Sequence, residues 1–296
     1  MDVIPTGSLF LDRSLGAGGL PTGWITELYG PPSSGKTTLA LHILAEAQQI
    51  GLTAAFLDIE NGLDPDYARR CGVNPEQALI ASPDNGTKAL TLCQMLLKSG
   101  GVQLVVLDSL AGLTSNREAA FGIRPDRYGE LNPLLASHLR KIDRICRTSG
   151  GTLLCTNQLR TRTRKGYGTP ETTPGGLTIK FHAAVRIALN VIYPLGKRGH
   201  YHGIRINAAV NKNRFHPRKH SAQIEIVYNK GVDKERELFS LGKKLQLITK
   251  QGPMYQYRGQ NLGQGQRAVY HTLQVNEHVA QALERDLRSR IFPHLR

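Results

Sequence analysis

Residues 30-GPPSSGKT-37 match the pattern G-x-x-x-x-G-K-[S/T] and decide the fold. The apolar stretch 24-WITELY-29 precedes them, and 37-TTLALHILAEAQQ-49, rich in helix-forming residues, follows at once. In this context small residues let backbone N–H groups surround a phosphate at the positive end of a helix. Lys36 can reach the β- and γ-phosphates, and the Thr37 hydroxyl can bind Mg²⁺. The stretch therefore predicts a phosphate-binding loop of a nucleotide hydrolase.

Strand and helix patterns alternate on both sides of this loop. Alternation followed by a run of strands indicates an α/β fold with a mostly parallel central sheet that antiparallel strands extend. Near Gly231 the pattern changes to a mixed, charged segment, so we expect a core over residues 1–232 and a small α/β subdomain over 233–296. The expected strands are 24–29, 53–60, 102–109, 151–158, 183–193, 204–212 and 222–229, and the expected helices are 37–49, 64–72, 87–100, 130–150 and 277–292.

Two carboxylates are predicted to lie beside the bound phosphates. Asp108 ends the apolar strand 104-LVVLD-108, the position of the second acidic residue of such hydrolases, and can hold Mg²⁺ together with Thr37. Glu60 ends another apolar strand, 55-AFLDIE-60. A carboxylate at the tip of a strand in the same sheet can reach the γ-phosphate and act as general base.

The charge of the chain suggests an anionic partner. Lys and Arg number 38 and Asp and Glu 23, for a net charge of +15, and hydrophobic residues make up 40% of the chain, enough for a core. No apolar run approaches the length of a membrane span, and the first residues carry no signal-peptide pattern, so we expect a soluble cytoplasmic protein without a membrane partner. The four cysteines form no C-x-x-C pair, which argues against a metal or disulfide framework.

The excess positive charge is concentrated in one part of the chain. Residues 159–220 hold thirteen Lys and Arg and a single acid, Glu171. The segment opens with 159-LRTRTRKGYGTPETTPGG-176, which has neither helical nor strand periodicity. Basic side chains bind phosphates without reading sequence, and an aromatic residue such as Tyr167 can stack on any base, worth about 1–3 kcal/mol. The stretch is either a solvent-exposed charged loop or a loop that binds nucleic acid.

A family resemblance is carried by the segments 28-LYGPPSSGKTTLALHI-43, 56-FLDIENGLDPDYARRCGV-73, 105-VVLDSLAGLT-114, 157-NQLR-160, 168-GTPETTPGG-176 and 259-GQNLGQGQ-266. With these segments the sequence resembles the bacterial RecA recombinase family over nearly its whole length. The resemblance implies a RecA-like P-loop NTPase fold, DNA-stimulated ATP hydrolysis, and homologous pairing and strand exchange in recombination and repair.

The resemblance also assigns roles around the nucleotide. Glu60 is similar to the carboxylate that activates water, and Lys36 and Gln158 complete the expected catalytic set. Asn157 and Gln158 match the pair that senses the γ-phosphate and relays its presence to the next loop, which is chemically sensible for amides at a strand end. The expected ATP-binding residues are Gly30, Pro31, Pro32, Ser33, Ser34, Gly35, Lys36, Thr37, Thr38, and, around the adenine, Asp64, Tyr67 and Tyr228.

Two segments match DNA-binding loops of the family. They are 117-REAAFGIRPDRYGE-130 and the basic stretch 159–176, in which a glycine pair lets backbone N–H groups approach a phosphate. The resemblance implies single-stranded DNA as partner, with duplex DNA as a second. The residues expected to contact DNA are Arg127, Tyr128, Arg140, Arg160, Arg162, Arg164, Lys165, Tyr167, Gly175 and Gly176.

The resemblance further implies self-association into a filament or ring, with ATP between subunits. Lys212 and Arg214, in 211-NKNRF-215, are candidates to complete a neighbour's site, although their register looks closer to the K-N-R-F motif of the related RadA proteins. Residues 1–3 come almost directly before the core segment 6-TGSLFLD-12, so we expect the family's N-terminal polymerisation element to be missing.

Two other functions stay open at this point. The first is a non-filamentous, RadA-like accessory or branch-migration ATPase, which the expected lack of the N-terminal element and the K-N-R-F register favour. The second is an ATP-gated DNA-binding protein without useful turnover. The presence of Lys36, Thr37, Glu60 and Asp108 argues against the second.

Overall fold

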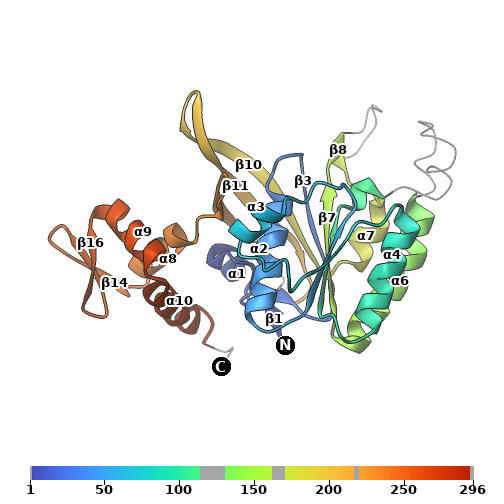
Figure 1. The fold of residues 1–296 in the computed structure, drawn as a ribbon, viewed down its shortest axis with the longest axis horizontal. Coiled ribbons are helices and arrows are strands. Elements are labelled where there is room, and N and C mark those ends of the chain that lie inside the picture. Colours follow the sequence, from blue (N-terminus) through green and yellow to red (C-terminus); the bar gives the residue numbers. More distant parts are fainter. Residues whose placement is uncertain (1, 114–130, 162–170, 217–219, 294–296) are drawn as a thin grey trace.

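The computed structural model describes residues 2–113, 131–161, 171–216 and 220–293, and a nine-stranded sheet forms the larger part of the fold (Figure 1). Six neighbouring strands pair in parallel, and the three strands at one edge of the sheet add antiparallel pairings. The mostly parallel sheet with an antiparallel extension that the sequence predicts is thereby confirmed. In spatial order the strands are β13 (Gly231–Val232), β12 (Ser221–Val227), β11 (His200–Asn213), β10 (Val185–Lys197), β3 (Ile25–Gly30), β7 (Thr152–Gln158), β6 (Leu104–Asp108), β4 (Ala54–Asp58) and β5 (Leu79–Ala81).

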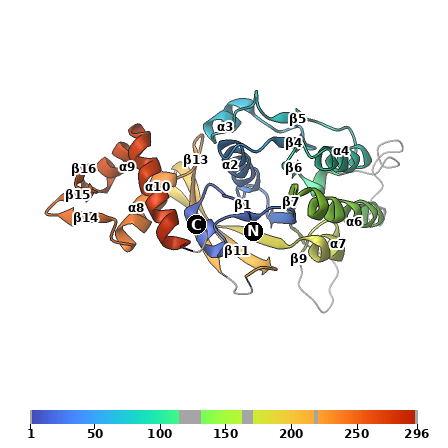
Figure 2. The same ribbon diagram turned by 90° about the horizontal axis from the view of Figure 1, so that it is seen from below.

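Helices cover both faces of the sheet, because its central strands carry apolar side chains on both faces. In β6, Val106 packs into the apolar cluster under helix α2 (Lys36–Gln49), whereas Val105 and Leu107 pack into the cluster on the other face. Figure 2 shows α2 on one side of the strands and the second group of helices on the other. That group is α4 (Gly86–Lys98), α6 (Leu131–Ser149) and α7 (Gly176–His182), while α1 (Leu9–Leu15) and α3 (Pro65–Arg70) contribute to the α2 side.

The structure differs from the sequence prediction at several boundaries. Strand β4 ends at Asp58, so Glu60 lies two residues beyond the strand tip instead of at it. Helices α1 and α7 were not expected; each has seven residues, and the apolar pattern of so short a helix is weak. Short elements complete the core: β1 (Val3–Ile4) with β2 (Leu20–Pro21), β8 (Arg160–Thr161) with β9 (Glu171–Thr172), and the 3₁₀ turn η1 (Leu110–Gly112).

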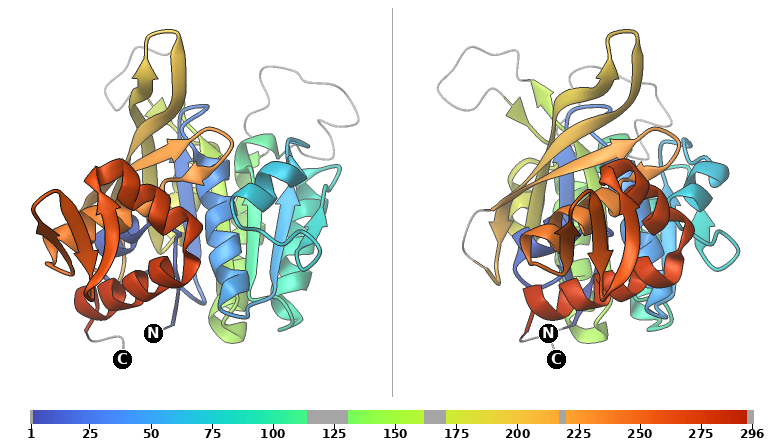
Figure 3. Two further views of the ribbon diagram at one scale, coloured as in Figure 1. Left: turned by 60° about the vertical axis from the view of Figure 1, so that its left-hand side comes forward. Right: turned by 90° about the vertical axis from the view of Figure 1, so that its left-hand side faces the viewer.

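Strands β10 and β11 form a hairpin that extends beyond the rest of the sheet (Figure 3). Only Val185–Ala188 of β10 pair with β3, while the pairing with β11 continues from Val185 to Lys197. The hairpin is longer than the two predicted strands, because residues 194–203 carry Gly and Pro and mask the strand pattern in the sequence.

The C-terminal residues build a second, smaller sheet with its own apolar cluster. Leu262, Leu283 and Leu287 lie at the centre of this cluster, and Leu9 of α1 also packs into it. The sheet is antiparallel and lies beside the main sheet (Figure 1). Its elements are α8 (Lys234–Lys244), β14 (Ile248–Gln251), β15 (Met254–Tyr257), β16 (Gln260–Gln264), α9 (Gly265–Val275) and α10 (Glu277–Ile291).

Buried polar contacts join this C-terminal part to α1. The Ser8 hydroxyl donates to Glu237 at 2.7 Å, and the backbone N–H of Phe10 donates to the same carboxyl at 3.2 Å. The Arg288 guanidinium lies 3.0 Å from the Asp12 carboxylate. Burial raises the pKa of Glu237 to about 8 and, against the opposing effect of Arg288, the pKa of Asp12 to about 6.

This junction predicts that folding stability falls as pH rises. Between about pH 5 and pH 8 the folded chain retains protons that the unfolded chain has released, because the folded pKa values are the higher ones. From pH 5 upward, Glu237 titrates up to about pH 8 and Asp12 up to about pH 6, so at about 1.4 kcal/mol per pH unit for each group the loss amounts to roughly 5–6 kcal/mol. Urea unfolding from pH 5 to 9 measures it, and Glu237→Gln should flatten the profile, whereas the exposed Glu76→Gln should not. An equally steep profile in Glu237→Gln would show that Glu237 is not the cause.

Within the ranges that the structure describes, no helix combines the length and apolar character needed to cross a membrane.

Candidate active site

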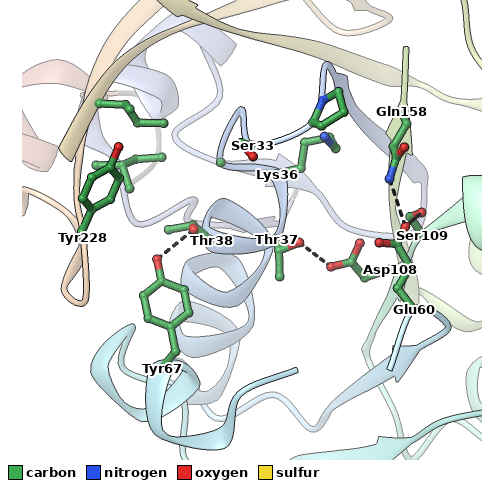
Figure 4. Close-up of a pocket in the computed structure, with 14 residues that line it drawn as sticks. Ser33, Lys36, Thr37, Thr38, Glu60, Tyr67, Asp108, Ser109, Gln158 and Tyr228 are labelled. Carbon is green, nitrogen blue, oxygen red and sulfur yellow. Dashed lines mark hydrogen bonds between the residues drawn. The ribbon is translucent and has the colours of Figure 1, made fainter. Parts of the chain in front are cut away.

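The carboxyl ends of the parallel strands β3, β4, β6 and β7 meet at one edge of the sheet, where ligands of such sheets bind. A cavity of about 370 Å³ opens at this edge between the start of α2 and the β10–β11 hairpin (Figure 4). Its walls bring together residues that lie far apart in the sequence. They are Pro32, Ser33, Gly35, Lys36, Thr37, Thr38, Glu60, Tyr67, Asp108, Ser109, Gln158, Ile204, Ile226 and Tyr228.

The loop between β3 and α2, which is the predicted phosphate-binding loop, contains two residues with a positive φ. Gly35 precedes the helix with φ 84°, and a Cβ at this position would lie only 2.4 Å from Cδ1 of Ile226. Ser33 also has a positive φ, of 57°. The Lys36 ammonium donates to the carbonyls of Gly30 at 3.2 Å and Pro31 at 2.7 Å. Burial lowers the pKa of Lys36, although Asp108 and Glu60 oppose the effect. A negatively charged phosphate would be a stronger hydrogen-bond partner for this ammonium than the two carbonyls are.

Thr37 and Asp108 meet at the floor of the cavity. The Thr37 hydroxyl donates to Oδ2 of Asp108 at 2.6 Å, and the Thr156 hydroxyl donates to Oδ1. Burial raises the pKa of Asp108, while the two hydroxyls oppose that change. Among the described residues no group of three or more His, Cys, Asp or Glu side chains could hold a metal. One hydroxyl and one carboxylate fit Mg²⁺, which in nucleotide sites uses few protein ligands and completes its shell with phosphate and water.

Glu60 lies on the same side of the cavity as Asp108 and Ser109 and is exposed (Figure 4). Its Oε1 accepts hydrogen bonds from the Ser109 hydroxyl and from Nε2 of Gln158, the latter at 3.3 Å (Figure 4). The structure thus brings the predicted base and the predicted γ-phosphate sensor into contact. Ser109 was missed in the sequence, although its place directly after Asp108 at a strand end was the available signal.

Tyr67 and Tyr228 line the end of the cavity away from Glu60 and Gln158 (Figure 4). The Tyr67 hydroxyl is 2.8 Å from that of Thr38, and burial raises the pKa of Tyr67 to about 12, so it stays a neutral hydrogen-bonding group. Ile204 and Ile226, partners across β11 and β12, form an apolar wall there. An aromatic and apolar end suits a nucleobase, while the Lys36 end suits phosphates.

The remaining predicted nucleotide residues lie around this cavity. Asp64 is the N-cap of α3, accepts from the N–H of Asp66 at 2.8 Å and is not among the lining residues. Gly30, Pro31 and Ser34 are likewise not among the lining residues, and a Cβ on Gly30 would meet the Leu189 carbonyl at 2.2 Å.

Comparisons with known proteins point to the same family over nearly the whole chain. Residues 1–233 match the family described as the RecA N-terminal domain, and residues 236–291 match the RecA C-terminal domain. The chain belongs to the RecA family. Protein RecA of Caldanaerobacter subterraneus subsp. tengcongensis is 40% identical over 288 residues, which are 97% of this chain and 84% of that protein.

Further RecA proteins give the same picture. Protein RecA of Oleidesulfovibrio alaskensis is 41% identical over 286 residues, 96% of this chain and 82% of that protein. Protein RecA of Nocardia farcinica is 40% identical over 291 residues, 98% of this chain and 84% of that protein. Similarity of this extent to proteins named RecA supports a RecA recombinase function for the chain.

Only part of the predicted DNA surface of this RecA-family chain falls on described residues. Arg140 is exposed on α6, and α6 packs beside α7. Gly175 and Gly176 open α7 with φ 82° and 49°, and a Cβ on Gly175 would lie 2.8 Å from Cδ1 of Leu135. Arg160 belongs to β8, and its side chain is not described. The other predicted contacts, Arg127, Tyr128, Arg162, Arg164, Lys165 and Tyr167, lie outside the described residues.

The two candidates for a role in a neighbouring RecA subunit have different surroundings. The Lys212 ammonium donates to the carbonyls of Lys180 at 2.8 Å and Phe181 at 3.2 Å, at the end of α7. Arg214 is exposed, and its guanidinium lies 5.1 Å from the centre of the Trp24 ring. Both lie toward the start of β3, whereas the phosphate-binding loop follows its end.

Proposed function

We propose that this RecA-family protein binds ATP and Mg²⁺ in the cavity, hydrolyses ATP, and is stimulated in this by single-stranded DNA. RecA-family proteins bind ATP and are DNA-dependent ATPases, and the site has the groups that this activity needs. The observation that carries the proposal is the contact between Gln158 and Glu60. Gln158 is also the last residue of β7 before the basic segment 159–176, so a single side chain belongs to the hydrolytic site and to the start of the DNA loop.

In the proposed reaction, the loop 30–37 holds the phosphates through its backbone N–H groups and Lys36, and the base lies between Tyr67 and Tyr228. Glu60 accepts a proton from the water that attacks the γ-phosphate, and Gln158 hydrogen-bonds the γ-phosphate oxygens. Thr37 and Asp108 would hold Mg²⁺, which neutralises charge on the β- and γ-phosphates. Positioning and charge stabilisation supply most of the catalysis in phosphoryl transfer, and both are supported by the contacts of these side chains.

We further propose that the basic segment binds DNA phosphates and that subunits associate head to tail. The hairpin strands β10 and β11 and their flanks hold no acid between Glu171 and Glu225, which favours an anionic partner. In a head-to-tail filament or ring, the start of β3 in one subunit can face the nucleotide edge of the next. Arg214, exposed at that end, is the better candidate to reach the neighbour's ATP, because Lys212 already has two carbonyl partners. Residues 1–232 and 233–296 are proposed as core and C-terminal subdomain.

The test is steady-state ATP hydrolysis with and without oligo(dT), over a salt series. We expect the rate to rise on adding DNA and the effect to weaken steeply with salt, since each phosphate contact contributes about −0.7 to the log–log slope of binding. DNA-independent hydrolysis, or none, would contradict the proposal. Electron microscopy with oligo(dT) and a non-hydrolysable ATP analogue then distinguishes long filaments from rings or short oligomers.

A further inference from the structure

Glu27 is a fully buried acid in the middle of β3 that the proposed reaction does not use. Its side chain has no exposed surface. It lies between two strands, opposite Cys155 of β7 and Arg186 of β10. A buried charge is costly unless every oxygen has a donor, so its partners define what it can do.

The first partner is Asn157, whose amide forms hydrogen bonds at both ends of the basic segment 159–176. Nδ2 of Asn157 donates to Oε1 of Glu27 at 2.9 Å and to the carbonyl of Pro174 at 3.0 Å. Its Oδ1 accepts the backbone N–H of Gln158 at 3.0 Å. One amide group therefore holds the strand end that carries Gln158 and the segment that leads into Gly175, and the Glu27 carboxylate fixes the orientation of that amide.

The second partner is Arg186, which donates from Nε to Oε2 of Glu27. The Arg186 guanidinium lies 4.4 Å from the centre of the Tyr29 ring, and its side chain is almost fully buried. Across the ladder Arg186 pairs with Lys212, whose ammonium holds the last carbonyls of α7. The same carboxylate is thus tied to both ends of the segment Pro174–His182: through Asn157 to its beginning, and through the β10–β11 ladder to its end.

We propose that Glu27 is a positioning residue that couples the nucleotide site to the base of the DNA loop. It acts through Asn157. When Gln158 shifts toward the γ-phosphate, the Asn157 amide that accepts its backbone N–H moves with it. Pro174 then moves too, because its carbonyl accepts from the same amide. The amide cannot rotate independently, because rotation would leave the buried Glu27 oxygen and the Pro174 carbonyl without donors. This inference rests on the proposed function and names the side chain that gives it its regulation.

The simpler alternative is that Glu27 and Arg186 only stabilise the sheet. Two double variants separate the two possibilities, since both remove the buried charges together. In Glu27→Gln/Arg186→Met the carbonyl oxygen of the new side chain can still accept from Asn157. In Glu27→Leu/Arg186→Met nothing can. The two variants differ in the acceptor for Asn157 while both keep a side chain that fills the site.

The first readout is the stimulation of ATP hydrolysis by oligo(dT). In Glu27→Leu/Arg186→Met we expect it to fall by roughly 5–150-fold, the usual range of coupling between two sites. The rate without DNA and the KM for ATP should stay within about twofold of the parent protein, because neither residue touches the nucleotide. In Glu27→Gln/Arg186→Met the stimulation should be largely retained. Thermal unfolding checks that both variants are folded.

The second readout needs no DNA and so separates this inference from the proposed function. Hydrogen exchange of the segment 173–182 should respond to a non-hydrolysable ATP analogue in the parent protein and in Glu27→Gln/Arg186→Met, but not in Glu27→Leu/Arg186→Met. Equal responses in the two variants, or none in the parent, would overturn the role of Glu27. A parent protein that shows the exchange response but no stimulation by oligo(dT) would support the coupling inside the chain and overturn the DNA-dependent function.

Discussion

The Glu60→Gln variant is expected to hydrolyse ATP about 10²–10⁴-fold more slowly than the parent protein, which is the usual contribution of a general base. Glutamine has the same length and can still accept the Ser109 hydroxyl, but it cannot take a proton from water. Lys36, Thr37 and Asp108 are untouched, so the affinity for ATP should change by no more than a few-fold. Single-turnover hydrolysis and binding of a fluorescent ATP analogue measure the two quantities separately.

Glu76→Gln is the matched control for this prediction, since it makes the same chemical change at an exposed position outside the cavity. Its rate should equal that of the parent protein. Turnover that survives in Glu60→Gln would mean that another group activates the water. No turnover in the parent protein itself would favour the ATP-gated binding protein over the ATPase. A slow Glu60→Gln variant that still binds DNA in the presence of ATP would instead fit a protein held in its ATP-bound, DNA-binding state before hydrolysis.

The site could be predicted from the sequence where local pattern carries the information. The loop 30–37 is contiguous, and its chemistry follows from residue type and spacing alone. Asp108 and Gln158 end predicted strands, and the ends of parallel strands meet at one edge of a sheet, so their proximity follows once the strands are recognised. The resemblance to RecA added the roles of Tyr67 and Tyr228, which no local pattern suggests.

Residues that depend on the register of distant strands could not be predicted. Ile204 and Ile226 reach the cavity only because β11 and β12 pair in the observed register beside Gly35. Glu27 sits in 24-WITELY-29, where an acid in an apolar strand usually faces solvent. Its burial depends on Asn157 and Arg186, which are 130 and 159 residues away in the sequence. The small C-terminal sheet was missed as individual strands, because residues 248–264 are polar and contain several glycines.

The second large effect is expected from Arg186→Met, which leaves the buried Glu27 carboxylate without its counter-charge. Methionine fills a similar volume but donates no hydrogen bond. Removing one member of a buried pair typically costs about 3–5 kcal/mol of folding free energy, because the remaining charge is uncompensated. Glu27 is wholly buried and Arg186 is 11% exposed, so water can hydrate neither side chain effectively. Urea unfolding at pH 7 measures the loss.

Arg236→Met is the comparison for this variant. Arg236 pairs with Glu225, but it is 44% exposed and Glu225 keeps Arg205 as a second partner, so we expect a cost of no more than about 1 kcal/mol. Adding Glu27→Gln to Arg186→Met should recover most of the lost stability, since no buried charge then remains unpaired. A cost in Arg186→Met as small as in Arg236→Met would mean that water or another cation reaches Glu27. The buried carboxylate would then not be the fixed anchor that the orientation of Asn157 requires, and the coupling through it would fail on physical grounds before any DNA is added.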